Sequence, residues 1–268
     1  MPHAPRSVKR EKRAPARHRG KVPLNRALSK LGILSRAQAT EAIRAGRVRV
    51  NGRLVKDPAT LVVPERSRVA VDGEPRAQAT WRTIVFHKPR GIVTTRSDPD
   101  GRQTVFDVLG DAGRGLVAVG RLDRATSGLL LLTTDTRLAN WIADPANQIP
   151  RMYVVTVRGR IDESAIDRLT AGIGAGPSAS RADAVVLRKS SSRESHLTVE
   201  LREGRNRQVR RLVAAIGHEV TRLKRVRLGG LELKNLDPGG WRDVSQEEIA
   251  EVFPGARIAD RQSRRDIP

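Results

Sequence analysis

The stretch GRLDRATSGLLLLTTD, residues 120–135, places one carboxylate, Asp123, among basic and hydroxyl side chains directly before an apolar run. The run 129–132 shows no alternation of apolar and polar residues, so it predicts a strand that is buried on both faces. An acid at the edge of such a strand, between Arg121 and Arg124, is expected to stay ionised. Its role remains open between a nucleophile or base that acts on a bound nucleotide and a turn aspartate bonded to its own backbone amides.

The charge of the chain points to a polyanionic partner. Its 268 residues hold 51 Lys and Arg against 29 Asp and Glu, a formal net charge of +22, and nucleic acid is the natural ligand of such a surface. The chain has no cysteine, which excludes disulfides and thiolate zinc sites, and its five histidines are scattered without metal-ligand spacing. No apolar run is long enough to span a membrane, and no targeting segment follows the basic start, so we expect a cytoplasmic protein.

Composition divides the chain into five segments. Residues 1–21 are rich in Lys, Arg and Pro and are expected to form a disordered basic arm. A small unit is expected over 22–73, a linker over 74–80, a larger unit over 81–252 and a basic tail over 253–268.

The small unit reads as two helices followed by a hairpin. Leucines at positions 24, 28 and 31 have helical spacing, Gly32 ends that helix, and Ser35 is expected to cap the next one. The dipeptide Asn51-Gly52 between alternating apolar and basic residues is a strong signal for a two-residue hairpin turn.

The larger unit mixes strands and helices, which predicts an α+β fold. The segment 83–95 reads as a strand, a Pro-Arg-Gly turn and a second strand, and Asp135 is expected to cap a helix that begins near Thr136. Further strands are expected within 153–159, 182–189 and 196–204, and helices within 163–173 and 207–217.

The segment LNRALSKLGILSRAQATEAIRAGRVRVNG, residues 24–52, resembles the RNA-binding module first seen in small-subunit ribosomal protein four. The resemblance implies that this unit binds structured RNA. The alternative is a charged spacer. The residues expected to contact RNA are Arg26, Arg36 and Arg44.

Four segments of the larger unit resemble, in the same order, the motifs of RsuA-type ribosomal RNA pseudouridine synthases. They are HKPRGIVTT, GRLDRATSGLLLLTTD, RMYVVTVRG and EGRNRQVRRLVAAIGHEVTRLKRVRLGGL. The resemblance implies a mixed, largely antiparallel sheet flanked by helices. Two positions depart from the family pattern: Arg151 stands where a lysine is usual, and Arg207 stands where a histidine is frequent.

The resemblance also assigns roles to residues of this sequence. Asp123 becomes the catalytic aspartate, Tyr153 the tyrosine beside the target base, and Arg210 the arginine paired with the aspartate. Arg121 becomes the residue that helps fill the space of the extruded nucleotide. The other residues expected to contact RNA in this unit are Lys88, Arg124, Arg205, Arg207 and Arg211.

The function implied is the isomerisation of one uridine of ribosomal RNA to pseudouridine, with the large-subunit RNA favoured over the small-subunit RNA. The reaction has no redox step and no energy input, so no cofactor and no metal are expected. Two alternatives remain: a catalytically inert RNA-binding factor for ribosome assembly, and a component of the small ribosomal subunit. We expect a monomer that binds ribosomal RNA and no membrane.

Overall fold

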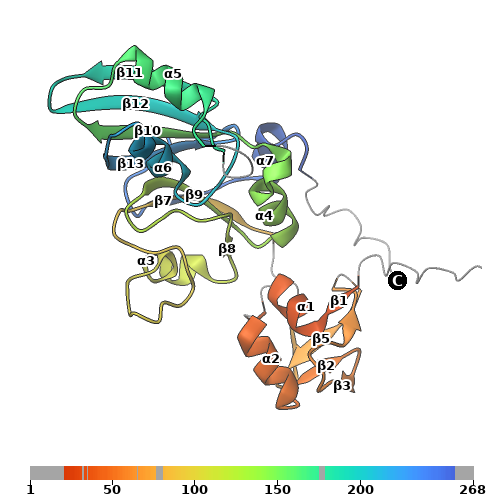
Figure 1. Ribbon diagram of the computed structural model, residues 1–268. Coiled ribbons are helices and arrows are strands. Elements are labelled where there is room, and N and C mark those ends of the chain that lie inside the picture. Colours follow the sequence, from red (N-terminus) through yellow and green to blue (C-terminus); the bar gives the residue numbers. More distant parts are fainter. Residues whose placement is uncertain are drawn as a thin grey trace, which may run out of the picture. The chain divides into compact units, whose positions relative to one another are not determined.

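The computed structural model describes residues 21–256 apart from 32, 35, 65, 77–80 and 175–178. Contacts within the chain divide it into two compact units, 1–77 and 78–268, which are described separately (Figure 1). The predicted N-terminal arm lies outside the described residues except for the exposed Lys21, and so do 257–268 of the predicted tail. No helix in the described part of the chain has the length and apolar composition needed to cross a membrane.

The first unit packs two helices on a small sheet. The antiparallel sheet has the order β3-β2-β5-β6, and the short strands β1 and β4 pair separately. The predicted helical leucines and the apolar face of the second helix are all buried in one core. The elements are β1 (Val22–Pro23), α1 (Leu24–Lys30), α2 (Arg36–Arg44), β2 (Val48–Val50), β3 (Arg53–Leu54), β4 (Leu61–Val62), β5 (Val69–Val71) and β6 (Glu74–Arg76).

The hairpin between β2 and β3 forms as predicted. Val50 pairs with Arg53, and the two residues between them, Asn51 and Gly52, have φ values of 50° and 82°. Two successive residues with positive φ are what a type I′ turn requires, and Asn-Gly supplies them with the least strain. The predicted end of the first helix at Gly32 and the predicted cap at Ser35 lie outside the described residues.

Two predicted boundaries are wrong. Residues 74–76 belong to β6, which pairs with β5, so the linker cannot begin at 74, and 77–80 lie outside the described residues. The C-terminal tail cannot begin at 253, because Phe253 is buried and packs edge-on against Trp141. The first segment forms a hairpin with the neighbouring strand β5, and the second is ordered by a contact with a residue distant in sequence.

The second unit is built on one long mixed sheet with the order β11-β12-β10-β13-β9-β7-β15, to which β14 adds on β13 and β8 on β9. All pairs are antiparallel except β13 with β9. Its strands are β7 (Thr83–Lys88), β8 (Val117–Ala118), β9 (Ser127–Thr133), β10 (Arg151–Arg158), β11 (Ala184–Ser190), β12 (Glu194–Leu201), β13 (Val220–Leu228), β14 (Leu231–Glu232) and β15 (Trp241–Asp243).

Helices cover this sheet in separate groups. Apolar residues of α5 and α6 pack on β10, β12 and β13, whereas α4 and α7 pack on β7 and β9 (Figure 1). The helices are α3 (Val105–Leu109), α4 (Thr136–Ala143), α5 (Glu163–Ala171), α6 (Gln208–Ala215) and α7 (Gln246–Val252), with 3₁₀ turns at Gly110–Gly113 and Pro145–Asn147. The predicted α+β class is confirmed.

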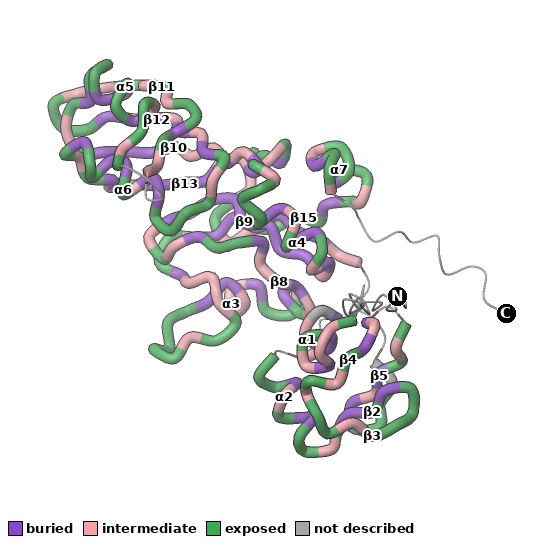
Figure 2. Tube along the Cα trace, turned by 45° about the vertical axis from the view of Figure 1, so that its right-hand side comes forward, coloured by how far each residue is buried: buried purple, intermediate pink, exposed green. Residues whose placement is uncertain are grey.

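The apolar run that follows Asp123 forms β9 and is buried on both faces, as predicted (Figure 2). Leu129 and Leu131 pack with α4 and α7, while Leu130 and Leu132 pack with α3 on the opposite side of the sheet. A strand covered on both faces has no polar side, which explains the missing alternation. At the end of β9, the Asp135 carboxylate accepts hydrogen bonds from the first amides of α4, so the predicted cap is confirmed.

The second strand predicted after the Pro-Arg-Gly turn does not form. Val93 makes only an isolated bridge to Thr104, and the chain around it bends. The apolar side chain in this segment, Ile92, is buried against α3 and is not part of a ladder. Apolar residues alone do not distinguish a strand from a loop that covers a core.

Candidate active site

The loop between β8 and β9 carries Asp123 and is held at the junction of two parallel strands. Gly128 of β9 pairs with Arg225 of β13, and its φ is +109°. A Cβ atom at Gly128 would lie 2.1 Å from the carbonyl oxygen of Arg225, so only glycine allows the two backbones to approach this closely. The junction therefore fixes the Asp123 loop next to β13.

Lys88 anchors the same loop from inside the protein. Its Nζ donates to the carbonyl oxygens of Asp123 at 3.1 Å, Thr126 at 2.8 Å and Pro89 at 3.1 Å. The residue is fully buried. Burial lowers the pKa of Lys88 to about 8, and the Asp123 carboxylate partly opposes this shift. Lys88 has no surface to offer to RNA, so the prediction that it contacts RNA is wrong: its ammonium group orders the backbone of the loop instead.

The Asp123 carboxylate faces a cluster of arginines. Its side chain is 34% exposed, and its Oδ2 lies 3.8 Å from Nη1 of Arg207. Arg207 starts α6 with φ +50°, a left-handed conformation that is uncommon for a side chain with a Cβ. Because structures keep such residues where the surroundings demand them, this local strain is typical of a functional position.

The side chain of Arg210 supports the loop by donating to backbone carbonyl groups. Its Nη2 donates to Ala125 O at 3.2 Å and its Nη1 to Val220 O at 3.0 Å. Burial and the neighbouring Arg207 lower the pKa of Arg210, whereas Asp123 raises it. Within the described residues the cation closest to the Asp123 carboxylate is thus Arg207, and Arg210 acts on the carboxylate at longer range. The ion pair implied by the family resemblance is replaced in this structure by a contact with the loop backbone.

A cavity of about 270 Å³ opens beside the carboxylate. Its lining includes Asp123 and Arg121 of the loop, the segment Glu203–Gln208, and Tyr153 of β10. Tyr153 is half-buried and packs on the core under α5 and α6. An anion, an aromatic ring and several cations around one hollow give a site that can hold a nucleotide and act on it.

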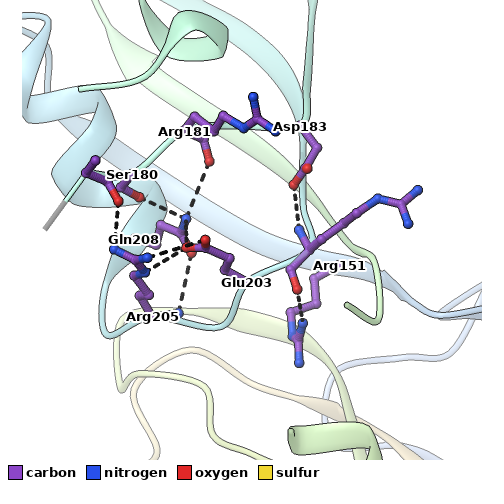
Figure 3. Close-up of polar contacts among 9 residues, drawn as sticks. Arg151, Ser180, Arg181, Asp183, Glu203, Arg205 and Gln208 are labelled. Carbon is purple, nitrogen blue, oxygen red and sulfur yellow. Dashed lines mark hydrogen bonds and ion pairs between the residues drawn. The ribbon is translucent and has the colours of Figure 1, made fainter. Parts of the chain in front are cut away.

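A network of polar contacts fixes the Glu203–Gln208 wall (Figure 3). The Gln208 amide donates to Ser180 Oγ at 2.9 Å, and Arg205 pairs with Glu203 at 2.7 Å. Arg151, which stands where the family usually has lysine, donates to Arg202 O at 3.2 Å. Arg151 therefore holds the wall of the cavity from inside the protein.

The remaining residues that the sequence predicts to contact RNA are exposed. Arg121 and Arg124 lie on the loop of Asp123, and Arg205, Arg207 and Arg211 lie at or near the start of α6. These exposed arginines differ from Arg210, which is half-buried and donates to two backbone carbonyl groups inside the protein. In the first unit the residues Arg26, Arg36 and Arg44 are also exposed.

Sequence reasoning missed two residues of the site. Arg151 and Arg225 both line the cavity and are buried, with 6% and 4% of their surface exposed. Arg151 opens a mostly apolar strand, but Arg225 stands among other basic residues of β13 (VTRLKRVRL), so no signal in the sequence marked it as the buried one.

Comparisons with known proteins agree with this geometry. The family model for RNA pseudouridylate synthases matches residues 82–215, and the model for the S4 domain matches residues 22–67. The chain belongs to the RNA pseudouridylate synthase family. It is therefore an RNA pseudouridine synthase with an S4 domain at its N-terminus, as the resemblance implied.

Relatives cover nearly the whole chain. A protein of Aquifex aeolicus described as an uncharacterized RNA pseudouridine synthase is 36% identical over 91% of this chain and 99% of its own length. Ribosomal large subunit pseudouridine synthase B of Escherichia coli K12 is 37% identical over 90% of this chain and 88% of its own length. A crystal structure of a pseudouridylate synthase shares 28% identity and superposes with a TM-score of 0.60 over 86% of this chain and 99% of that chain.

Proposed function

We propose that this synthase isomerises a uridine of large-subunit ribosomal RNA to pseudouridine, with Asp123 as the acting carboxylate. The observation that carries the proposal is that Asp123 and Tyr153 line the same cavity. The relatives named for ribosomal large subunit pseudouridine synthase B support the choice of RNA.

The reaction needs an anion at the ribose. The bond from C1′ to N1 of uracil breaks, the base rotates, a bond from C1′ to C5 forms, and the proton on C5 is removed. Asp123 either attacks C1′ or removes the ribose 2′ proton, and both routes leave the carboxylate unchanged at the end. Tyr153 packs against the detached base, and the positive charge of Arg207 lies beside the carboxylate.

The target base must leave its stack to reach this cavity. Arg121 is exposed on the loop of Asp123 and can fill the gap that the flipped nucleotide leaves. The other exposed arginines of the loop and of α6 are placed to bind phosphates, and Arg26, Arg36 and Arg44 extend this binding from the S4 domain. With few aromatic residues in the chain, RNA recognition relies on phosphates and shape.

The experiment maps pseudouridine chemically in large- and small-subunit ribosomal RNA transcripts after incubation with the parent protein or with Asp123→Asn. The parent is expected to produce one modified position in the large-subunit RNA, and Asp123→Asn none, with nearly unchanged RNA affinity. Modification in the small-subunit RNA alone would overturn the choice of substrate. Turnover by Asp123→Asn above about 1% of the parent rate would overturn the role of Asp123, given that losing an essential catalytic group costs far more than 100-fold. A parent protein that binds both RNAs and modifies neither would leave the inert assembly factor as the correct interpretation.

A further inference from the structure

The cavity beside Asp123 contains two buried arginines with different surroundings. Arg151 is fully engaged, because its guanidinium donates to the carbonyl oxygens of Ile149 at 2.7 Å, Arg202 at 3.2 Å and Ile142 at 3.3 Å. Arg225 donates only its Nε–H, to Leu129 O at 2.8 Å, and its Nη2 is buried without any hydrogen-bond partner in the described structure. The two arginines therefore differ in what they leave unsatisfied.

No carboxylate in the described part of the chain compensates this charge. The two acids that line the cavity, Asp123 and Glu203, pair with Arg207 and Arg205 at the exposed rim. Among the described residues, no acidic side chain lies within 4 Å of the Arg225 guanidinium. Arginine stays protonated in proteins, and a buried donor without an acceptor is costly. An acceptor that is brought in by a bound molecule would remove this cost.

The position of Arg225 selects the part of a nucleotide that would supply the acceptor. Arg225 and Tyr153 are direct partners across β13 and β10, so their side chains leave the same face of the sheet with Cβ atoms about 4.5–5.5 Å apart. The arginines available to phosphates, Arg121, Arg205 and Arg207, are exposed at the rim. A group that contacts Arg225 therefore lies beside the tyrosine in the buried part of the cavity, where a flipped base and not the RNA backbone would be found.

We propose that Arg225 donates a hydrogen bond from Nη2 to a carbonyl oxygen of the target uracil and stabilises the base after it is detached. This inference rests on the proposed function of the Asp123 site. When the bond from C1′ to N1 breaks, its electron pair remains on uracil, and the negative charge spreads onto O2 and O4. When C5 bonds to C1′, the proton leaves C5 and N1 takes up a proton, so the charge on the oxygens disappears again.

A buried guanidinium on these oxygens interacts most strongly with the charged, detached base. An interaction that strengthens as charge develops lowers the barrier of the step, in the manner of an oxyanion hole. Arg225 would thus be a catalytic residue that contacts the base, whereas Arg151 holds the surrounding wall.

The test uses three variants of the full chain. Arg225→Gln removes the charge, Arg225→Lys keeps it, and Arg227→Gln is the matched control. Arg227 lies on the same strand but pairs with Glu200 at 2.9 Å, and it does not line the cavity. Single-turnover rates at saturating RNA are measured on a synthetic stem-loop around the mapped uridine, with oxygen, 2-thio or 4-thio substitution at that uridine.

Arg225→Gln is expected to lower the rate by about 100- to 1000-fold, the loss typical of one oxyanion donor, with little change in affinity. Arg225→Lys recovers part of the rate, and Arg227→Gln stays within about threefold of the parent. One of the two thio substitutions slows the parent, because sulfur is a poor acceptor, and has no further effect in Arg225→Gln.

Three results would overturn the inference. The first is a rate of Arg225→Gln within threefold of the parent rate, and the second is a thio substitution that slows parent and variant equally. The third is an unchanged rate with weaker RNA binding and a smaller salt dependence of that binding, which would indicate a phosphate contact. If circular dichroism shows that Arg225→Gln does not fold, the test uses the rates of the parent and of Arg225→Lys on the thio-substituted RNAs. If neither thio substitution slows the parent, the inference is overturned. Failure of the proposed function is distinct, because the parent itself would then form no pseudouridine.

Discussion

Replacing Gly128 with alanine tests how the structure places the Asp123 loop. The added Cβ would lie 2.1 Å from the carbonyl oxygen and 2.6 Å from the amide nitrogen of Arg225. Both atoms belong to the backbone of β13, so no side-chain rotation can relieve the overlap. The strands must separate at their parallel junction, which carries the loop of Asp123 on one side and Arg225 on the other.

The expected cost has three parts. Alanine at φ +109° is strained by about 1–2 kcal/mol. Forcing a methyl group into packed backbone costs about 1–3 kcal/mol, and weakening a backbone hydrogen bond at the junction costs about 1 kcal/mol. The sum, about 3–6 kcal/mol, corresponds to a fall in melting temperature of roughly 6–24 °C for a domain of this size.

The assay is thermal unfolding followed by circular dichroism, together with single-turnover pseudouridine formation below the lower melting temperature. Gly217→Ala is the matched control, because its φ is +86° and its Cβ would meet no atom within 4 Å. The control should lose only the strain of about 1–2 kcal/mol. If Gly128→Ala is no less stable than Gly217→Ala and is as active as the parent, close approach of the strands is not the reason for glycine at 128.

Arg210→Ala should lower the saturated rate at least 100-fold and destabilise the protein by about 1–3 kcal/mol, because it leaves the carbonyl groups of Ala125 and Val220 without their donor. A rate equal to that of the parent would contradict this prediction. The pKa of Lys88 is about 8 in the folded protein and higher in the unfolded chain, so unfolding takes up a proton above pH 8. The stability of the parent relative to Lys88→Met, measured by urea unfolding, should therefore rise by about 1 kcal/mol or more between pH 8 and pH 10. A stability difference that stays level over this range would show that Lys88 is not the titrating group. Replacing Arg26, Arg36 and Arg44 together with alanine should leave the saturated rate nearly unchanged. The slope of the logarithm of the RNA-binding constant against the logarithm of the salt concentration should fall by about 0.7–0.9 for each phosphate contact that is lost. An unaltered slope would show that these residues do not contact RNA. EDTA should not change turnover on folded RNA, and a loss of turnover that only Mg²⁺ restores would contradict the metal-free chemistry.

Local patterns in the sequence predicted the elements that depend on neighbouring residues. The Asn51-Gly52 turn needs only two residues that tolerate positive φ. The cap at Asp135 depends on amides two and three residues away. The unalternating run before it could be read as a buried strand because burial on both faces removes every polar position.

Contacts between distant segments could not be read in the same way. Phe253 looks like part of a tail until it meets Trp141, more than a hundred residues earlier in the chain. Lys88 looks like an RNA contact because a lysine beside proline and glycine is usually exposed. Its true environment is set by three carbonyl groups, two of which lie on a loop more than thirty residues away.

The arrangement of charge explains why an acid stands in a chain so rich in cations. Exposed arginines surround the cavity, and their attraction for phosphates is useful only outside it. Inside, the Asp123 carboxylate lies 3.8 Å from Nη1 of Arg207, whose positive charge limits the repulsion between the carboxylate and the RNA backbone. Among the described residues, the buried Arg225 is left without a carboxylate. The lining of one cavity thus holds an anion and a buried cation without a carboxylate partner among the described residues. In the reaction we propose, the sugar meets the anion, and the departing base, which carries the negative charge, meets the cation.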